Sequence, residues 1–386
     1  MAATVVALTA SGTSTGAVRS QTTSEIGTQL AELKGSDTVA ADTFGSSVAI
    51  SGATAVVGAE GHDKNAGRAY VFTEAGGVWK QTTELKGSDT VANDGFGDSV
   101  AISGTTALVG AYGHADTAGR AYVFTEAAGI WKQVAELRGS DTVAHDSFGI
   151  SVAISGATAV IGAGGRASFA GRAYVFTETA GVWKQTAKLK AFDTVANDGF
   201  GDSVAISSTI AIVGASGHAS SAGRAYVFTK TAGVWKQTAE LKGSDTVTRD
   251  GFGDSVAISG STGIVGAAGH ASFAGAAYVF TKTAGLWKQT AKLTGSDTGA
   301  NDGFGDSVAI SGTTAVVGAG GHASSAGTAY VFTEKAGVWK QTAELKGYDT
   351  VTQDGFGGSV ATLGTIAVVG ATGHAKKAGR TYVFEA

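Results

Sequence analysis

Imidazole side chains recur along this chain at a fixed interval, and an imidazole can be a hydrogen-bond partner, a metal ligand or a proton carrier. Six of them are spaced by multiples of 52 residues, and an arginine takes the place of the imidazole in the third copy. Five copies carry a further arginine six residues later. The candidate ligand-binding ring consists of His62, His114, Arg166, His218, His270, His322 and His374, together with Arg68, Arg120, Arg172, Arg224 and Arg380.

Three interpretations of this ring remain open. In the first, His and Arg pair with aspartates of a neighbouring loop and hold adjacent repeats together. In the second, the ring binds a repeated ligand, such as a glycan or an acidic chain. In the third, His and Asp bind a metal ion together. One His per loop gives no chelating pair and Arg166 interrupts the pattern, so we expect no metal ion and no cofactor.

Two aspartates also recur in every copy, from Asp37 and Asp42 to Asp349 and Asp354. Paired carboxylates can carry out acid–base catalysis. Their contexts, Ser-Asp-Thr and Asp-Gly-Phe-Gly, favour capping of backbone amides and formation of turns. A catalytic residue is needed once, whereas these appear seven times. We therefore predict no catalytic residues and no enzyme.

The elements that must position these side chains follow from the repeat itself. A Phe-Gly pair recurs every 52 residues from Phe44 to Phe356, without an insertion. A fixed period of this length indicates a repeat architecture. Within one copy, alternating or β-branched runs separated by glycine-containing turns predict four short strands. In the second copy these are Phe96–Ser103, Thr106–Ala111, Arg120–Thr125 and Ile130–Leu137.

Four-stranded units repeated radially are the blades of a propeller. The sequence thus predicts an all-β, seven-bladed β-propeller with four antiparallel strands per blade. The last copy stops after its third strand, at Ala386, while Ile26–Lys34 aligns with the fourth strand Val78–Lys86 at a shift of 52. We expect this N-terminal strand to complete the last blade and close the ring, which removes the open sheet edge.

Composition restricts the function classes. The net charge of −4 and the lack of a Lys or Arg run argue against nucleic-acid binding. The chain has no cysteine, which excludes disulfides and thiolate-ligated metals. No run approaches 18 apolar residues, so we expect no membrane span. We expect a monomer.

Residues 1–24 form a separate segment, and residues 25–386 a single propeller domain. Met1–Ala10 is apolar and Ser11–Ala17 is small and polar, as in the tail of a secretory signal, but the first positive charge is Arg19. The segment is therefore either a remnant of a signal or a disordered leader.

The unit Phe96-Gly-Asp-Ser-Val-Ala-Ile-Ser-Gly, followed by Val109-Gly-Ala111 and Gly119-Arg-Ala-Tyr-Val-Phe124, resembles the FG-GAP repeat of integrin α-subunit propellers in its compact bacterial form. The resemblance covers residues 25–386. It implies a seven-bladed propeller, usually extracellular or at the cell surface, that binds protein or carbohydrate partners without catalysis.

Two departures from that family's pattern matter. The proline of the Gly-Ala-Pro triplet is absent. The connection that often holds calcium in integrin-type repeats is here a tight turn without a carboxylate, such as Ser103–Thr106, so calcium is not expected there.

Function should then reside on the opposite face, where the loop between blades (Gly87–Gly95) and the loop joining strands two and three (Gly113–Gly119) are expected to lie together. We predict an adhesion-type binding module that recognises protein or glycan through this face. A structural scaffold or spacer without a small ligand is the alternative, and a propeller hydrolase or lyase comes third.

Overall fold

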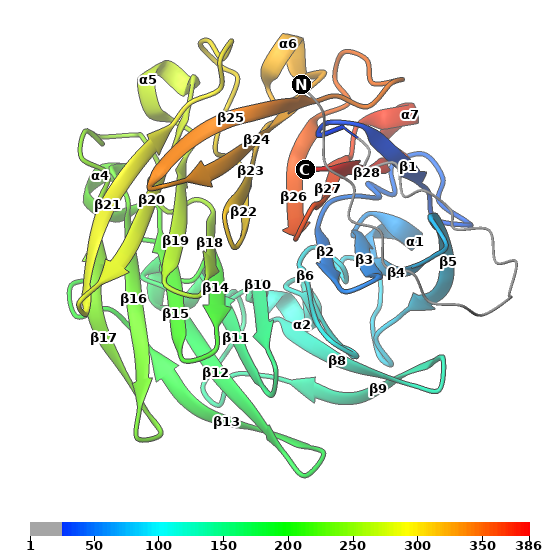
Figure 1. Cartoon of the computed structure of the whole chain (residues 1–386). Helices are drawn as coiled ribbons and strands as arrows, with labels where there is room; N and C mark the ends of the chain where they lie inside the picture. Colours follow the sequence, from blue (N-terminus) through cyan, green and yellow to red (C-terminus); the bar gives the residue numbers. More distant parts are fainter. Residues whose placement is uncertain (1–24) are drawn as a thin grey trace, which may run out of the picture.

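Residues 25–386 of the computed structural model are described here, and they form one closed ring of seven four-stranded antiparallel sheets (Figure 1). The predicted fold class is therefore confirmed. The expectation for residues 1–24 lies outside the described residues. In the first six blades the strands run from the central axis to the rim in chain order, and in the seventh the outer strand is the first strand of the chain.

The innermost strands are β2 (Val48–Ser51), β6 (Val100–Ser103), β10 (Phe148–Ser155), β14 (Val204–Ser207), β18 (Val256–Ser259), β22 (Val308–Ser311) and β26 (Phe356–Leu363). The second strands are β3 (Thr54–Ala59), β7 (Thr106–Ala111), β11 (Thr158–Ala163), β15 (Ile210–Ala215), β19 (Thr262–Ala267), β23 (Thr314–Ala319) and β27 (Ile366–Ala371).

The third strands are β4 (Arg68–Ala75), β8 (Arg120–Ala127), β12 (Arg172–Thr179), β16 (Arg224–Thr231), β20 (Ala276–Thr283), β24 (Thr328–Lys335) and β28 (Arg380–Glu385). The outer strands are β5 (Val78–Leu85), β9 (Ile130–Leu137), β13 (Val182–Leu189), β17 (Val234–Leu241), β21 (Leu286–Leu293), β25 (Val338–Leu345) and, for the seventh blade, β1 (Gln29–Leu33).

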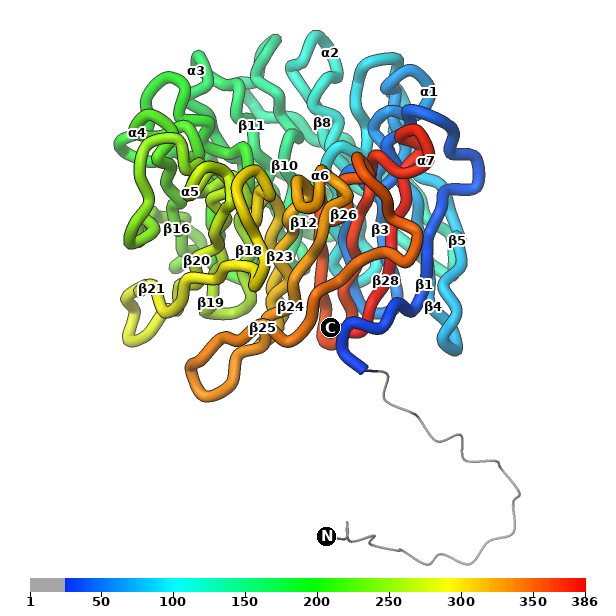
Figure 2. Tube along the Cα trace, turned by 90° about the horizontal axis from the view of Figure 1, so that it is seen from above, coloured from blue at the N-terminus to red at the C-terminus, as the bar shows by residue number. Residues whose placement is uncertain are grey.

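One short left-handed turn joins the second and third strand of every blade, where the sequence predicts a loop. The turns are α1 (His62–Asn65), α2 (His114–Thr117), α3 (Arg166–Phe169), α4 (His218–Ser221), α5 (His270–Phe273), α6 (His322–Ser325) and α7 (His374–Lys377). Figure 2 shows all seven on one face of the ring, with the hairpins between third and outer strands on the other. We call these the loop face and the hairpin face.

Two of the four strand boundaries predicted for the second copy need correction. The first strand begins at Val100 and not at Phe96, because the Phe96–Ser99 stretch turns: the amide of Asp98 donates to the carbonyl of Gly95 at 3.1 Å. The third strand continues to Ala127 instead of ending at Thr125. The second and fourth strands have the predicted bounds.

The Phe of each Phe-Gly pair fills the space between neighbouring blades. Phe96 is fully buried and packs with Val71 of the first blade and with Tyr122 and Phe124 of the second. Its ring centroid lies 5.5 Å from that of Tyr122 and 6.0 Å from that of Phe124, distances at which aromatic pairs attract. The 52-residue Phe-Gly pattern is thus the pattern of the interblade core.

The ring closes as the alignment of the chain ends predicts. Strand β1 pairs with β28, with Glu32 opposite Tyr382 and Leu33 opposite Thr381. Leu33 is buried at the same position as Leu85, the last residue of the outer strand in the first blade. The N-terminal segment therefore supplies the fourth strand of the seventh blade, beside the C-terminal strand (Figure 1).

Candidate functional site

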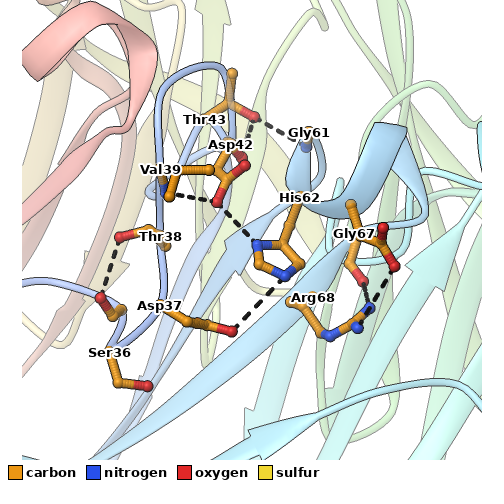
Figure 3. A network of polar contacts seen from close by, with 12 residues as sticks. Ser36, Asp37, Thr38, Val39, Asp42, Thr43, Gly61, His62, Gly67 and Arg68 are labelled. Carbon is orange, nitrogen blue, oxygen red and sulfur yellow. Dashed lines mark hydrogen bonds and ion pairs between the residues drawn. The ribbon is translucent and has the colours of Figure 1, made fainter.

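The histidines of the loop face are held by the aspartates of the interblade loops, as Figure 3 shows for the first blade. Nδ1 of His62 lies 2.8 Å from a carboxylate oxygen of Asp42, and Nε2 lies 3.7 Å from a carboxylate oxygen of Asp37. Because an ionised carboxylate only accepts, Nδ1 carries the proton and donates it to Asp42. The same geometry recurs at His114, His218, His270, His322 and His374, with Nδ1 contacts of 2.7–2.9 Å.

The second aspartate of each pair is a structural residue. Asp94 is 3% exposed, and the oxygen that accepts from His114 also accepts from the amide of Val91 at 2.9 Å. The first aspartate of the pair, Asp89, accepts from the hydroxyl of Tyr122 at 2.8 Å. Burial, with this hydrogen bond second, raises the pKa of Tyr122 and keeps its hydroxyl protonated. The carboxylates therefore set turns and orient side chains, as their sequence contexts predict.

The interblade loop bonds to both of the blades it connects. The amides of Asn93, Gly95 and Phe96 donate to the carbonyls of Lys64, Asn65 and Ala66 in the preceding blade, at 2.8–3.1 Å. Its aspartates hold the histidine and tyrosine of the following blade. The histidines therefore make the contacts with interblade aspartates that the first interpretation of the ring predicts.

The arginines do not make the contacts with interblade aspartates that the first interpretation of the ring predicts for them. Arg68, Arg120, Arg224 and Arg380 do not pair with the loop aspartates discussed above. Each places Nε 2.5–2.7 Å from a glutamate of the outer strand in its own blade, the partners being Glu84, Glu136, Glu240 and Glu32. Each also donates to the carbonyl of the glycine before it. These four pairs stabilise a blade internally, which corrects that part of the interpretation.

The third blade departs from the others. Arg166, in the position of the histidine, donates to Asp146 at 3.2 Å and to Asp141 at 3.5 Å, so it replaces the histidine as the partner of both aspartates. Arg172 has Lys188 where the glutamate would stand, and its Nε has no hydrogen-bond partner among the described residues. Lys188 instead reaches Asp141 at 3.1 Å.

Sequence reasoning missed two features of this face. The first is the glutamate partner of the arginines, although a signal existed: Arg and Glu stand 16 residues apart in three copies, and where Ala276 replaces the arginine, Lys292 replaces the glutamate. The second is a set of exposed valines, one in the interblade loop of every blade except the sixth, which we call the valine ring. Its members are Val39, Val91, Val143, Val195, Val247 and Val351, each 58–63% exposed.

A second group of carboxylates lines the mouth of the central channel on the loop face. Asp202, Asp254 and Asp306 come from three consecutive blades and line a cavity of about 220 Å³ with a ring of serines. The three side chains are exposed to the mouth, where their partial removal from bulk water is the main cause that raises the pKa of each to about 6; the charge of Asp254 is a second cause for Asp202 and Asp306. Burial, together with Glu60, also raises the pKa of Asp98. At neutral pH the three carboxyl groups with a pKa of about 6 are largely ionised, and their ionisation lowers the stability of the folded protein.

Stability should therefore fall as the pH rises through the titration of this mouth. Between about pH 4 and about pH 6 the folded protein binds protons that the unfolded chain has lost, so the free energy of unfolding decreases with pH and stays lowered above that interval. Asp254→Asn removes one charge and its repulsion on both neighbours. We expect the variant to melt above the wild type at pH 7.5 in a calorimetric scan.

The control is the same comparison at about pH 4, where the two melting temperatures should converge because most of these carboxyl groups are then protonated. A variant that melts below the wild type at pH 7.5 would show that the Asp254 carboxylate stabilises the fold, contrary to the prediction.

Fold and site together define a class: a closed β-propeller of seven similar blades, six of which repeat the same pairing of histidine and aspartate on the loop face. The family model of the FG-GAP repeat matches seven consecutive segments, residues 28–72, 79–124, 131–176, 183–228, 235–280, 287–332 and 339–384. The chain belongs to the FG-GAP repeat family. No curated protein matches it.

Each matched segment begins in or beside the outer strand of one blade and ends in the third strand of the next. The sequence repeat is therefore offset from the blade by one strand, which is why β1 must complete the seventh blade. A fold of this family suggests a binding or scaffold role. Among the described residues no helix is both long and apolar enough to cross a membrane.

Proposed function

We propose that this protein is a non-catalytic binding module, working as a monomer outside the cell or at its surface, that holds a partner through the loop face. The observation that carries the proposal is the valine ring. Six equivalent apolar side chains are each more than half exposed on a face whose aspartates and histidines are paired with one another. The side chains left free to meet a partner on this face therefore include a repeated apolar set, which stands among exposed charged residues such as Lys64 and Lys376.

Exposed aromatic residues add to this surface. Phe169 and Phe273 lie on the short turns α3 and α5, and Phe192 and Tyr348 lie in interblade loops; they are 56–81% exposed. Exposed apolar side chains rimmed by polar groups are typical of protein interaction sites, and aromatic residues are enriched at interface centres. A protein partner fits these side chains best.

A glycan is the second candidate, favoured by the exposed rings of Phe192 and Tyr348, since aromatic rings offer flat apolar faces for sugar rings. Six similar sites on one face would in either case act together, so weak single contacts would add up to stronger binding of a repetitive partner. A spacer without a ligand remains the alternative if neither class binds.

The test compares two multiple variants of the full chain. In the first, the six valines of the valine ring are changed to threonine. In the second, the matched control, Val78, Val182, Val234 and Val338 of the hairpin face are changed to threonine, since they are also 51–54% exposed. Both should melt like the wild type, because neither set is buried.

Binding is measured by interferometry against a panel of secreted and surface proteins and a glycan array, with and without divalent cations. We expect at least one ligand that binds the wild type and the hairpin-face variant equally, and the valine-ring variant at least about tenfold more weakly, a loss of roughly 1.4 kcal/mol. Equal binding by both variants would place the interaction elsewhere. No ligand in either panel would favour the spacer.

A further inference from the structure

A cation built into the protein stands beside the histidine and first aspartate in almost every blade. In the first, second, fourth and seventh blades it is an arginine that neutralises the glutamate of the outer strand. In the third blade Arg166 and Lys188 both reach Asp141. In the fifth blade Ala276 replaces the arginine, and Lys292 replaces the glutamate.

In the fifth blade, the space between the histidine and the first aspartate is occupied by a lysine ammonium group. Nζ of Lys292 lies 2.5 Å from a carboxylate oxygen of Asp245 and 2.9 Å from Nε2 of His270. Because Nδ1 of His270 donates to Asp250, its Nε2 presents a lone pair, and the ammonium group donates to it. The aspartate oxygen and the imidazole nitrogen thus converge on a single cation.

The sixth blade keeps the convergence and lacks the arginine, so the cation beside its glutamate is the exposed Lys346. Thr328 replaces the arginine, while the glutamate is retained as Glu344. Ligand atoms of Asp297, His322 and Glu344 lie within 4.8 Å of one another, the one such group of three among residues 25–386. Oε1 of Glu344 has the ammonium group of Lys346 as its ion-pair partner at 2.6 Å, and the fully buried Thr328 hydroxyl has no hydrogen-bond partner among the described residues.

Hydrogen bonds from neighbouring residues orient His322 and Asp297 in the way that metal ligands are usually oriented. Nδ1 of His322 donates to Asp302 at 2.8 Å, which leaves Nε2 unprotonated. A carboxylate on the far nitrogen is the usual partner of a metal-binding histidine, since it sets the tautomer and the ring orientation. The other oxygen of Asp297 accepts from the Tyr330 hydroxyl at 2.7 Å, which orients that carboxylate.

We propose that the sixth blade binds one divalent transition-metal ion, of the zinc type, through Nε2 of His322 and one carboxylate oxygen each of Asp297 and Glu344. An imidazole with two carboxylates suits zinc, and water completes a four-coordinate shell. Lys346, whose ammonium group lies 2.6 Å from Glu344, is 54% exposed at its side chain and swings away when the ion binds. This site is separate from the turns between the first and second strands of each blade, and it does not depend on the proposed function.

The experiment titrates zinc chloride into the tag-free full chain at pH 7.5 by calorimetry. The wild type should bind one equivalent, with magnesium unable to compete. Glu344→Gln should weaken binding roughly 10–100-fold. Thr328→Arg, which gives the sixth blade the arginine that five other blades carry, should abolish it. Arg120→Thr in the second blade frees Glu136 beside His114 and Asp89, and should raise the stoichiometry to two.

Melting curves without zinc establish that each variant is folded, so a lost site is distinguished from a lost fold. Absence of zinc binding by the wild type would overturn the proposal. So would binding that neither Glu344→Gln nor Thr328→Arg weakens, since the ion would then sit elsewhere. A stoichiometry that stays at one in Arg120→Thr would contradict the view that the arginine excludes the ion.

Discussion

A chain that starts at Gly35, and therefore lacks β1, is expected to melt far below the full chain or to associate into oligomers. Leu33 is 2% exposed, and losing a buried leucine costs about 2–5 kcal/mol. The ion pair of Arg380 with Glu32 disappears as well. The truncation also leaves β28 as an open edge, which pairs readily with other chains.

The missing strand can be returned as a synthetic peptide of residues 26–34. We expect the peptide to raise the melting temperature of the truncated chain in a concentration-dependent way, because a ligand that binds only the folded state stabilises it. A peptide of the same composition in scrambled order is the control. A truncated chain that melts as a monomer at the wild-type temperature would contradict closure by β1.

Gly119→Ala is the single substitution from which we expect the largest loss of stability. Gly119 forms a bridge to Phe148 of the next blade, and a Cβ there would lie 1.9 Å from the carbonyl oxygen of Phe148. Its φ of +80° is also unfavourable for any residue with a side chain. Since neighbouring backbones must move apart, we expect the free energy of unfolding in urea to fall by more than about 3 kcal/mol.

Gly104→Ala separates the backbone strain from the collision. Gly104 has φ +58°, but a Cβ there would meet nothing within 4 Å, since it lies in the tight turn between β6 and β7. This variant should lose only about 1 kcal/mol, the ordinary cost of a left-handed alanine. Equal losses in the two variants would mean that the close approach of the blades at Gly119 is not a determinant of stability.

The fold was predictable because each blade repeats the same physical solution. Phe96 and its six equivalents mark the interblade core, and the alternation in Ile130–Leu137 marks an outer strand with one exposed face. The 52-residue register between Ile26–Lys34 and Val78–Lys86 identified the closing strand from the alignment alone. The first strand was drawn too long because an apolar alternation that includes Phe96 does not reveal that Asp98 turns the chain.

The candidate site was predictable in its residues and less so in their partners. His114 and Arg120 are six residues apart in the chain. His114 hydrogen-bonds to Asp94 of the interblade loop, whereas Arg120 hydrogen-bonds to Glu136 of the outer strand. Nothing in the sequence spacing alone assigns these partners, because a register between strands decides which side chains meet. Whether the ring binds a ligand stays a prediction, although most of its hydrogen-bonding groups are used within the protein.

The special character of the sixth blade could be found only by comparing copies with the contacts in hand. Thr328 for arginine is an unremarkable change in a sequence. Once the arginine is known to neutralise the glutamate, the same change leaves Glu344, beside His322, with the exposed Lys346 as its ion-pair partner. The repeats of this chain thus serve as controls for one another, since in the sixth blade the cation beside the glutamate is the exposed Lys346 and not an arginine.

Nitrogen-detected NMR of the histidine side chains at about pH 8, with and without one equivalent of zinc, reports both the tautomers and the metal site. We expect the proton on Nδ1 in all six histidines of the loop face, and a zinc-induced shift of the Nε2 resonance of His322 alone; the six are His62, His114, His218, His270, His322 and His374. A majority of these histidines protonated on Nε2, or equal zinc shifts at all six, would contradict these expectations.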